Sequence, residues 1–270
     1  MATNRAQFHA PWSASKVNMA LRCPREFHYR YVDKLPQPET MPETRLGKVI
    51  HTALEKILLG ADQQVVLAEL RVDLEDDWEK DKFDRITANI PAYLQRLNEF
   101  GRKHRINRRM TEFFLAIRED GTPTQFYSGD AFFRGIFDAG YIFDNVNMAL
   151  IDHKTGERRK SSSMIAQLQG YAVLAAASFR QVRRFWLGMH WVANAVIDWS
   201  RPVSHSETQG ELLPNVFDNI EAAALAVSDG PRPNPGTWCE RCSYRSVCPA
   251  AWAVRFEPVD DETVEPGLED

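Results

Sequence analysis

Two aspartates and a lysine in the middle of the chain have the types and the spacing of a cation-dependent hydrolytic site. Asp138 ends the segment GIFD, and Asp152 and Lys154 lie in the segment LIDHK, one predicted hairpin later. Paired carboxylates bind Mg²⁺ or Mn²⁺, hard cations that prefer oxygen ligands and retain several waters. Such a cation can activate water and stabilise the charge that develops on a scissile phosphate.

Lys154 follows Asp152 by two positions. Side chains alternate along a strand, so both residues are expected to project to the same face. There the ammonium can orient or deprotonate the attacking water, or neutralise the phosphate, and the residues alone leave these roles open. They also leave open a simple ion pair on an exposed edge strand, because D-x-K is a short pattern.

The four cysteines suggest a second inorganic site. They are Cys23, Cys239, Cys242 and Cys248, and the last three form a C-x2-C-x5-C cluster. Zinc ribbons normally use two C-x2-C pairs, so one distant thiolate with a compact trio favours an iron–sulfur cluster. The alternatives are a zinc ion held by all four thiolates, disulfides, and unrelated buried cysteines. Disulfides are disfavoured in the expected compartment, the reducing cytoplasm.

Charge and hydropathy limit the partners. The net charge of the 270 residues is −4, but the segment 260–270 holds six acids and no base, so the rest of the chain is slightly basic. No run of 18 apolar residues predicts a membrane span. The bases form clumps that are typical both of phosphate contacts and of solvated surfaces. These clumps are Arg102, Lys103, Arg105, Arg108 and Arg109; Arg158, Arg159 and Lys160; and Arg180, Arg183 and Arg184.

The elements that must position these residues follow from apolar periodicity. Helical spacing predicts helices over 13–32, 47–59, 64–80 and 89–104, the first with Ser13 or Ser15 as its N-cap. Strands are predicted over 113–117, 126–127, 131–137, 139–143, 149–153 and 184–191, with hairpin turns at 120–121 and 144–145. Further helices are predicted over 163–177 and 218–228. The pattern predicts a mixed, largely antiparallel sheet after a mostly helical first part.

Six segments in this order resemble one family. They are SASKVNMALRCPREFHYRYVDKLP (13–36), GKVIHTALE (47–55), FRGIFDAG (133–140), LIDHKTGE (150–157), QLQGYA (167–172) and WCERCSYRSVCP (238–249). Together they resemble the PD-(D/E)XK nuclease superfamily and, within it, RecB-like iron–sulfur nucleases such as CRISPR-associated RecB-like exonucleases, their phage relatives and AddB/RecB nuclease domains. The resemblance implies an α/β (α+β), restriction-endonuclease-like core, with a helical N-terminal elaboration and a C-terminal Fe–S cluster segment.

The resemblance also implies roles for individual residues. His51, Asp138 and Asp152 would ligate the catalytic Mg²⁺ or Mn²⁺, helped by the backbone carbonyl of His153. Lys154 would be the catalytic lysine. Relatives commonly carry an aromatic or apolar residue in place of His153. We therefore expect its imidazole to lie behind the ligands, where an extra ligand or a pH-sensitive contact is conceivable.

Three further predictions follow from the same resemblance. Gln167 and Tyr171 stand four positions apart, share one helix face, and would support the site and contact the nucleic-acid strand. Glu112, where relatives often carry an acid before a strand, is a weaker site candidate. The four cysteines would hold a 4Fe-4S cluster that joins both ends of the chain and stabilises the fold.

The predicted organisation is one nuclease domain over 1–256, followed by an acidic, disordered tail over 257–270. Within the domain, 1–110 is mostly helical, 111–230 is the nuclease core and 231–256 is the cysteine segment. The predicted function is a metal-dependent deoxyribonuclease, a single-strand-preferring exonuclease in DNA end processing, recombination or CRISPR adaptation. The alternatives are a non-catalytic DNA-binding module and a zinc-stabilised scaffold. The chain lacks G-x-x-x-x-G-K-[ST], so a helicase or a recombination or CRISPR adaptation protein would be a separate partner.

Overall fold

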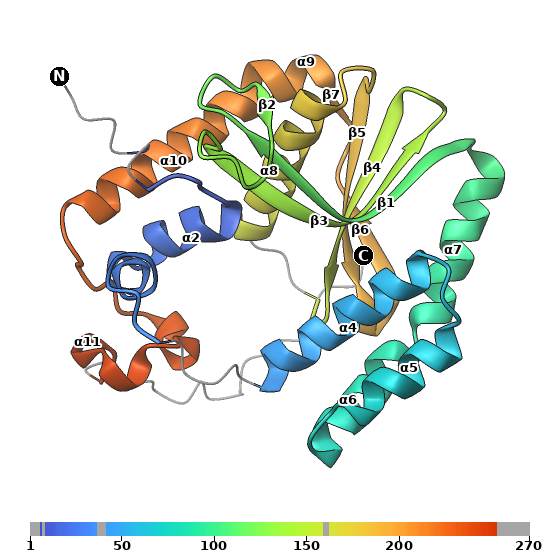
Figure 1. Cartoon of the computed structure of the whole chain (residues 1–270), viewed down its shortest axis with the longest axis horizontal. Coiled ribbons are helices and arrows are strands. Elements are labelled where there is room, and N and C mark those ends of the chain that lie inside the picture. The colour runs from blue at the N-terminus through green and yellow to red at the C-terminus, as the bar shows by residue number, and fades with distance from the viewer. Residues whose placement is uncertain (1–5, 7–8, 37–41, 159–161, 253–270) are drawn as a thin grey trace, which may run out of the picture.

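The computed structural model describes residues 6, 9–36, 42–158 and 162–252. Its centre is one mixed sheet of seven strands in the order β2-β1-β3-β4-β5-β6, with β7 paired to β5. Helices lie on both faces of this sheet (Figure 1). The arrangement confirms the predicted α/β architecture of a mixed sheet flanked by helices. The predicted acidic tail, 257–270, lies outside the described residues.

The strand order depends on a single crossover. The strands are β1 (Ile106–Ile117), β2 (Pro123–Thr124), β3 (Phe133–Phe143), β4 (Asn147–Lys154), β5 (Arg184–Trp191), β6 (Val196–Trp199) and β7 (Val203–Ser204). Paired strands are antiparallel except β4 and β5, which are parallel. A parallel pair needs a long connection, and helix α8 (Ser162–Ser178) provides it. This crossover carries α8 back over the sheet directly after the strand that holds Asp152 and Lys154.

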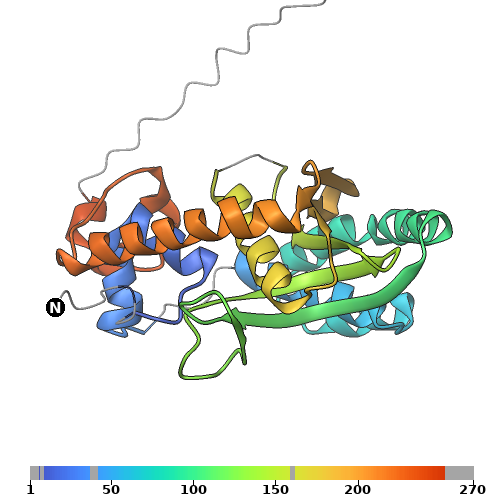
Figure 2. The ribbon, with the colours of Figure 1, turned by 90° about the horizontal axis from the view of Figure 1, so that it is seen from above.

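Two helical layers enclose the sheet, as Figures 1 and 2 show. One layer contains α2 (Ala14–Arg22), α8 and α10 (Leu213–Ser228), whose apolar side chains share a core with Phe137 and Leu150. The other contains α4 (Pro42–Leu58), α5 (Gln63–Val72), α6 (Asp77–Thr87) and α7 (Ile90–Lys103). Leu58 of α4 packs on the opposite face of the strands, against the cluster that contains Ala139 and Ile151. The short helices are α3 (Pro24–Phe27), α9 (His205–Glu207) and α11 (Pro249–Trp252).

Side-chain caps fix where several helices begin. Ser13, in extended conformation, accepts a hydrogen bond from the Lys16 backbone N–H and starts α2, which confirms one of the two predicted caps. Asp76 caps α6 in the same way. Its extended backbone interrupts the single helix predicted over 64–80, so that prediction is wrong. The apolar spacing continues through this region, but the Asp76 cap requires a new helix.

The strand predictions are correct in position and less so in extent. The segments predicted as two strands over 131–137 and 139–143 form one strand, β3, because its pairing with β1 continues past residue 138. β1 begins at Ile106, upstream of the predicted 113, since this charged stretch pairs with the end of β3. The predicted strand over 126–127 is a loop. The predicted turn at Asp144 and Asn145 is confirmed, with both residues in the left-handed region.

None of the helices in the described ranges combines the length and the apolar character needed to cross a membrane.

Candidate active site

The sheet divides at Asp138 and Asp152. β3 pairs with β4 only as far as Ala139 and Ile151, so Asp138 and Asp152 are the first opposed residues beyond the ladder. Upstream of Asp138, β3 stays with β1, and β4 stays with β5 through Lys154. Beyond Ala139 and Ile151 the two strands are no longer paired and each carries one aspartate; we call this point the opening between β3 and β4.

Asp138 is held by two donors from different elements. Its Oδ1 lies 3.0 Å from Nδ1 of His51, on α4, and its Oδ2 accepts a 2.6 Å hydrogen bond from the backbone N–H of His153. Burial would raise the pKa of Asp138, but the hydrogen bond and charge of His51 outweigh it and lower that pKa. Conversely, burial would lower the pKa of His51, and the hydrogen bond to Asp138 and its charge raise it. The pair is stabilised as an imidazolium and a carboxylate.

Glu112 joins this pair from β1. The β1–β3 register places it opposite Asp138, and its φ of 42° puts a non-glycine residue in the left-handed region within a strand. One ligand atom each of His51, Glu112 and Asp138 lie within 4.8 Å of one another. Burial, then the charge of Asp138, raises the pKa of Glu112. This weaker candidate from the sequence therefore belongs to the same cluster as His51 and Asp138.

Asp152 faces the opposite helical layer. Its Oδ1 accepts hydrogen bonds from Gln167 Nε2 at 2.9 Å and from the Tyr171 hydroxyl at 3.2 Å. Its Oδ2 lies 2.7 Å from Lys154 Nζ, with which it forms an ion pair. Lys154 Nζ also donates to Gln167 Oε1 at 3.1 Å. Burial, followed by the charge of Asp138, raises the pKa of Asp152.

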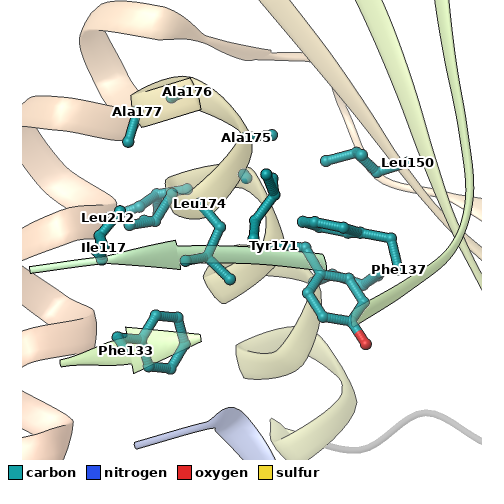
Figure 3. Packing of buried hydrophobic residues seen from close by; sticks show 14 of the residues in the cluster. Ile117, Phe133, Phe137, Leu150, Tyr171, Leu174, Ala175, Ala176, Ala177 and Leu212 are labelled. Atoms are coloured by element: carbon teal, nitrogen blue, oxygen red, sulfur yellow. The ribbon is translucent and has the colours of Figure 1, made fainter. Parts of the chain in front are cut away.

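Glycines allow α8 to hold Gln167 and Tyr171 so close to the strands. A Cβ on Gly135 of β3 would lie 3.0 Å from Leu174, and one on Gly170 would lie 2.9 Å from the Phe133 ring. The Tyr171 ring packs 4.5 Å from Phe137. In Figure 3 these two rings lie side by side and the Tyr171 oxygen points out of the apolar cluster. The packing thus fixes the hydroxyl that bonds Asp152.

His153 points away from Asp152, into a buried aromatic cluster. Its Nδ1 lies 2.9 Å from Nδ1 of His190, its register partner on β5, and Tyr93 stacks on His190 with 3.9 Å between ring centroids. Burial lowers the pKa of His153 to about 4 and also lowers that of His190, so both rings are neutral at pH 7. The His153 imidazole therefore lies behind the carboxylates, as expected. His190 was not singled out from the sequence, where its only signal was a histidine within an apolar strand.

The site residues fit a divalent cation. Without one, Asp138, Asp152 and Glu112 place carboxylates in a buried region where the charge of Asp138 raises the pKa of the other two. A bound divalent cation relieves such repulsion. The donor set of carboxylate oxygens and one imidazole suits Mn²⁺, and its oxygens suit Mg²⁺. Asp152 is not part of the group formed by His51, Glu112 and Asp138. The site therefore has two parts, that group and Asp152 with Lys154, and Asp138 lies opposite Asp152 between them.

The four cysteines line one pocket at the far end of the molecule. Cys23, Cys239 and Cys248 are buried, Cys242 is partly buried, and all four are free thiols. Backbone contacts join the two chain segments: the Asn234 side chain donates to the Arg22 carbonyl at 2.8 Å, and Arg25 N donates to Arg232 O at 3.1 Å. The structure thus brings together residues that lie more than 200 positions apart in the chain.

The basic clumps are not gathered at this site. Arg102 and Arg109 line a surface pocket beside α7, and Arg158 forms an ion pair with Asp198. Arg159 and Lys160 lie outside the described residues. Among the described residues, no hydrogen bond or ion pair joins one of these bases to His51, Glu112, Asp138 or Asp152.

Comparisons with known proteins agree with this geometry. A sequence model of the PD-(D/E)XK nuclease superfamily matches residues 11–249. A search of curated proteins found no match. Among solved structures, the "Putative exonuclease" from Eubacterium rectale has a similar fold, with 11% identity and a TM-score of 0.52 over 95% of this chain and 93% of that one. SSO0001 matches at 15% identity over 89% of this chain and 86% of that one, with a TM-score of 0.39, too low to establish a common fold.

Proposed function

The chain belongs to the PD-(D/E)XK nuclease superfamily and is a nuclease; on that premise, we propose that it is a Mg²⁺- or Mn²⁺-dependent exodeoxyribonuclease that prefers single strands or strand ends. The observation that carries the proposal is the opening between β3 and β4. There Asp138, in the middle of β3, lies opposite Asp152 near the end of β4, with Lys154 beside Asp152 and with His51 and Glu112 beside Asp138.

The site residues would have different roles in the reaction. A bound Mg²⁺ or Mn²⁺ would polarise the scissile phosphate and lower the pKa of the attacking water. Asp138 and Asp152 would hold that cation, with neutral His51 and the His153 carbonyl as further ligands. Lys154 would then hold its positive charge beside the reacting phosphate. Gln167 and Tyr171 orient Asp152 through its Oδ1, which leaves Oδ2 for the cation or Lys154.

The exonuclease and single-strand parts of the proposal have their own support. They follow from the family resemblance of the six sequence segments and from the similar fold of the Eubacterium rectale protein, whose name describes that protein as an exonuclease. A separate helicase or a recombination or CRISPR adaptation protein would supply the DNA end, since this sequence lacks the pattern G-x-x-x-x-G-K-[ST] of ATP-driven motors.

We also propose that the four cysteines hold a 4Fe-4S cluster, with structural zinc as the alternative. Support comes from the shared pocket, which four free thiols line at the junction of the first and last described segments. Thiolates are the ligands of both groups. The role would be structural, because ligand binding there would tie α3 to the segment that follows Pro233.

The experiment compares linear and circular single-stranded DNA as substrates of the anaerobically purified full chain, with Mg²⁺, Mn²⁺ or EDTA. We expect metal-dependent cleavage of the linear strand, release of short products from one end, and no cleavage of the circle. Cleavage of the circle would replace the exonuclease assignment with an endonuclease. DNA binding without cleavage under every metal condition would favour the non-catalytic binding module.

A further inference from the structure

A group of exposed aromatic side chains lies next to the opening. Phe114 is 45% exposed, Ile136 36% and Tyr127 82%. Phe126 lies between them, with its ring centroid 5.0 Å from those of both Phe114 and Tyr127, edge to face in each case. Arg134 places its guanidinium carbon 4.6 Å from the centre of the Phe126 ring. We call Phe114, Phe126, Tyr127, Arg134 and Ile136 the aromatic platform.

The platform continues the face of the sheet on which His51, Glu112 and Asp138 lie, whereas Asp152 and Lys154 face α8. Phe114 is paired with Ile136 in the β1–β3 ladder, two positions from Glu112 and Asp138 respectively. Two strand residues span about 7 Å. The neighbouring Phe113, Leu115 and Phe137 pack into the α8 core, so alternation directs Phe114 and Ile136 away from α8. That is the side on which α4 presents His51.

Charge distinguishes this surface from a plain apolar patch. Arg134 is paired with Ala116, two positions further along the ladder, and its Nη1 donates to the Phe126 carbonyl at 3.2 Å. Burial, followed by the charge of Arg134, lowers the pKa of Lys16 to about 8. Aromatic faces beside fixed cations are the combination that stacks nucleobases and tracks phosphates. Its continuity with Glu112 and Asp138 along the β1–β3 ladder favours the substrate strand over a separate partner.

We propose that the aromatic platform stacks the bases of a single DNA strand whose scissile phosphate lies at Asp138 and Asp152. This rests on the proposed nuclease function and names the residues that select its substrate. Bases in a duplex are paired and stacked on each other, so only an unpaired strand or a frayed end can lie on Phe114, Phe126 and Tyr127. Arg134 would contact the phosphate of the same segment.

The test separates base stacking from phosphate contact. In a Lys154→Ala background, which prevents cleavage, binding of a fluorescent single-stranded oligothymidylate is compared with that of an oligomer of equal length that lacks bases. We expect Tyr127→Ala and Phe126→Ala each to weaken oligothymidylate binding by about 5-fold or more, since stacking contributes about 1–3 kcal/mol per base. The same substitutions should not change binding of the base-free strand.

Control variants guard against an indirect effect. Trp78→Ala removes an exposed ring, 42% accessible, from α6 and should leave both affinities unchanged. Phe126→Leu keeps apolar volume if Phe126→Ala fails to fold, and Tyr127→Ala removes the most exposed ring. Equal losses on both oligomers, or no loss on either, would overturn the platform.

The outcomes also distinguish this proposal from the nuclease proposal. If the wild-type protein binds DNA in a base-dependent way but cuts none, the platform proposal is supported and the nuclease proposal is rejected. If the wild type cleaves DNA but the platform variants bind oligothymidylate normally, the platform proposal is rejected and the nuclease proposal stands.

Discussion

The backbone N–H of His153 donates a 2.6 Å hydrogen bond to Oδ2 of Asp138, across the point where β4 separates from β3. This bond replaces the ladder that ends one residue earlier, and it fixes the carboxylate of one strand to the backbone of the other. Because Asp152 immediately precedes His153, the bond also fixes the relative position of the two aspartates. A cation site that uses both aspartates needs a fixed distance and orientation between their carboxylates.

Cation affinity is expected to increase with pH. Contact with Asp138 raises the pKa of His51 above 6.5. Protonated His51 therefore stabilises the cation-free protein below pH 6.5, and this contribution is lost as pH rises through the raised pKa. A bound cation needs the neutral ring, so Mn²⁺ competes with the proton. Calorimetric titration with Mn²⁺ on both sides of the His51 pKa measures this competition, with His51→Gln as the control that lacks the imidazole. Equal pH dependence in both proteins would contradict the role of His51.

Removing the donors to Asp152 should weaken the cation site without unfolding the protein. Gln167→Ala deletes one donor to Oδ1 and the acceptor of Lys154, and we expect Mn²⁺ affinity to fall about 10-fold or more. Tyr171→Phe deletes only one donor, so its loss should be smaller. Gln95→Ala, an exposed glutamine on α7 that bonds Glu99, is the matched control. A loss in Gln95→Ala equal to that in Gln167→Ala would refute the positioning role.

The buried histidine pair should contribute to stability. His190→Leu leaves Nδ1 of His153 without a partner in a buried site, which costs about 1–3 kcal/mol of the free energy of unfolding. Urea denaturation measures the change. His104→Leu is the control, because His104 is exposed and bonds Asp144 at the surface. If His190→Leu is as stable as wild type, the pair is not a structural element.

The sequence was most informative where the chemistry is local. The D-x-K spacing placed Asp152 and Lys154 on one face of β4, and the four-residue spacing placed Gln167 and Tyr171 together on α8. The division of the sheet depends on where a ladder between strands stops, and no local pattern shows this. Glu112 reaches this cluster with its own backbone in the left-handed region, a conformation that the sequence does not reveal.

Contacts between residues that are distant in the chain were not predicted for a related reason. His153 and His190 are joined only by the parallel register of β4 and β5, which the α8 crossover sets. The helix predicted over 64–80 failed because apolar spacing persists across the Asp76 cap.

The cysteine site predicts a chemical composition. Anaerobically purified protein should contain iron and sulfide in a fixed ratio, and Cys23→Ser or Cys239→Ser should lower both together and reduce the thermal midpoint. Ser243→Ala, an exposed neighbour of Cys242, should change neither. Protein that contains zinc and no iron or sulfide would replace the cluster with a structural zinc ion.

The central claim is that Asp138, Asp152 and Lys154 form one hydrolytic site, in which the aspartates hold the cation and the lysine acts on the phosphate. Single-turnover cleavage of end-labelled single-stranded DNA, measured beside Mn²⁺ affinity for the wild type, Asp152→Asn and Lys154→Met, tests it most directly. We expect Asp152→Asn to lose both cleavage and Mn²⁺ affinity. Lys154→Met should bind Mn²⁺ and lose cleavage by at least about 100-fold, as expected for the loss of a group that stabilises developing charge. Metal-dependent cleavage at the wild-type rate in either variant would contradict the account.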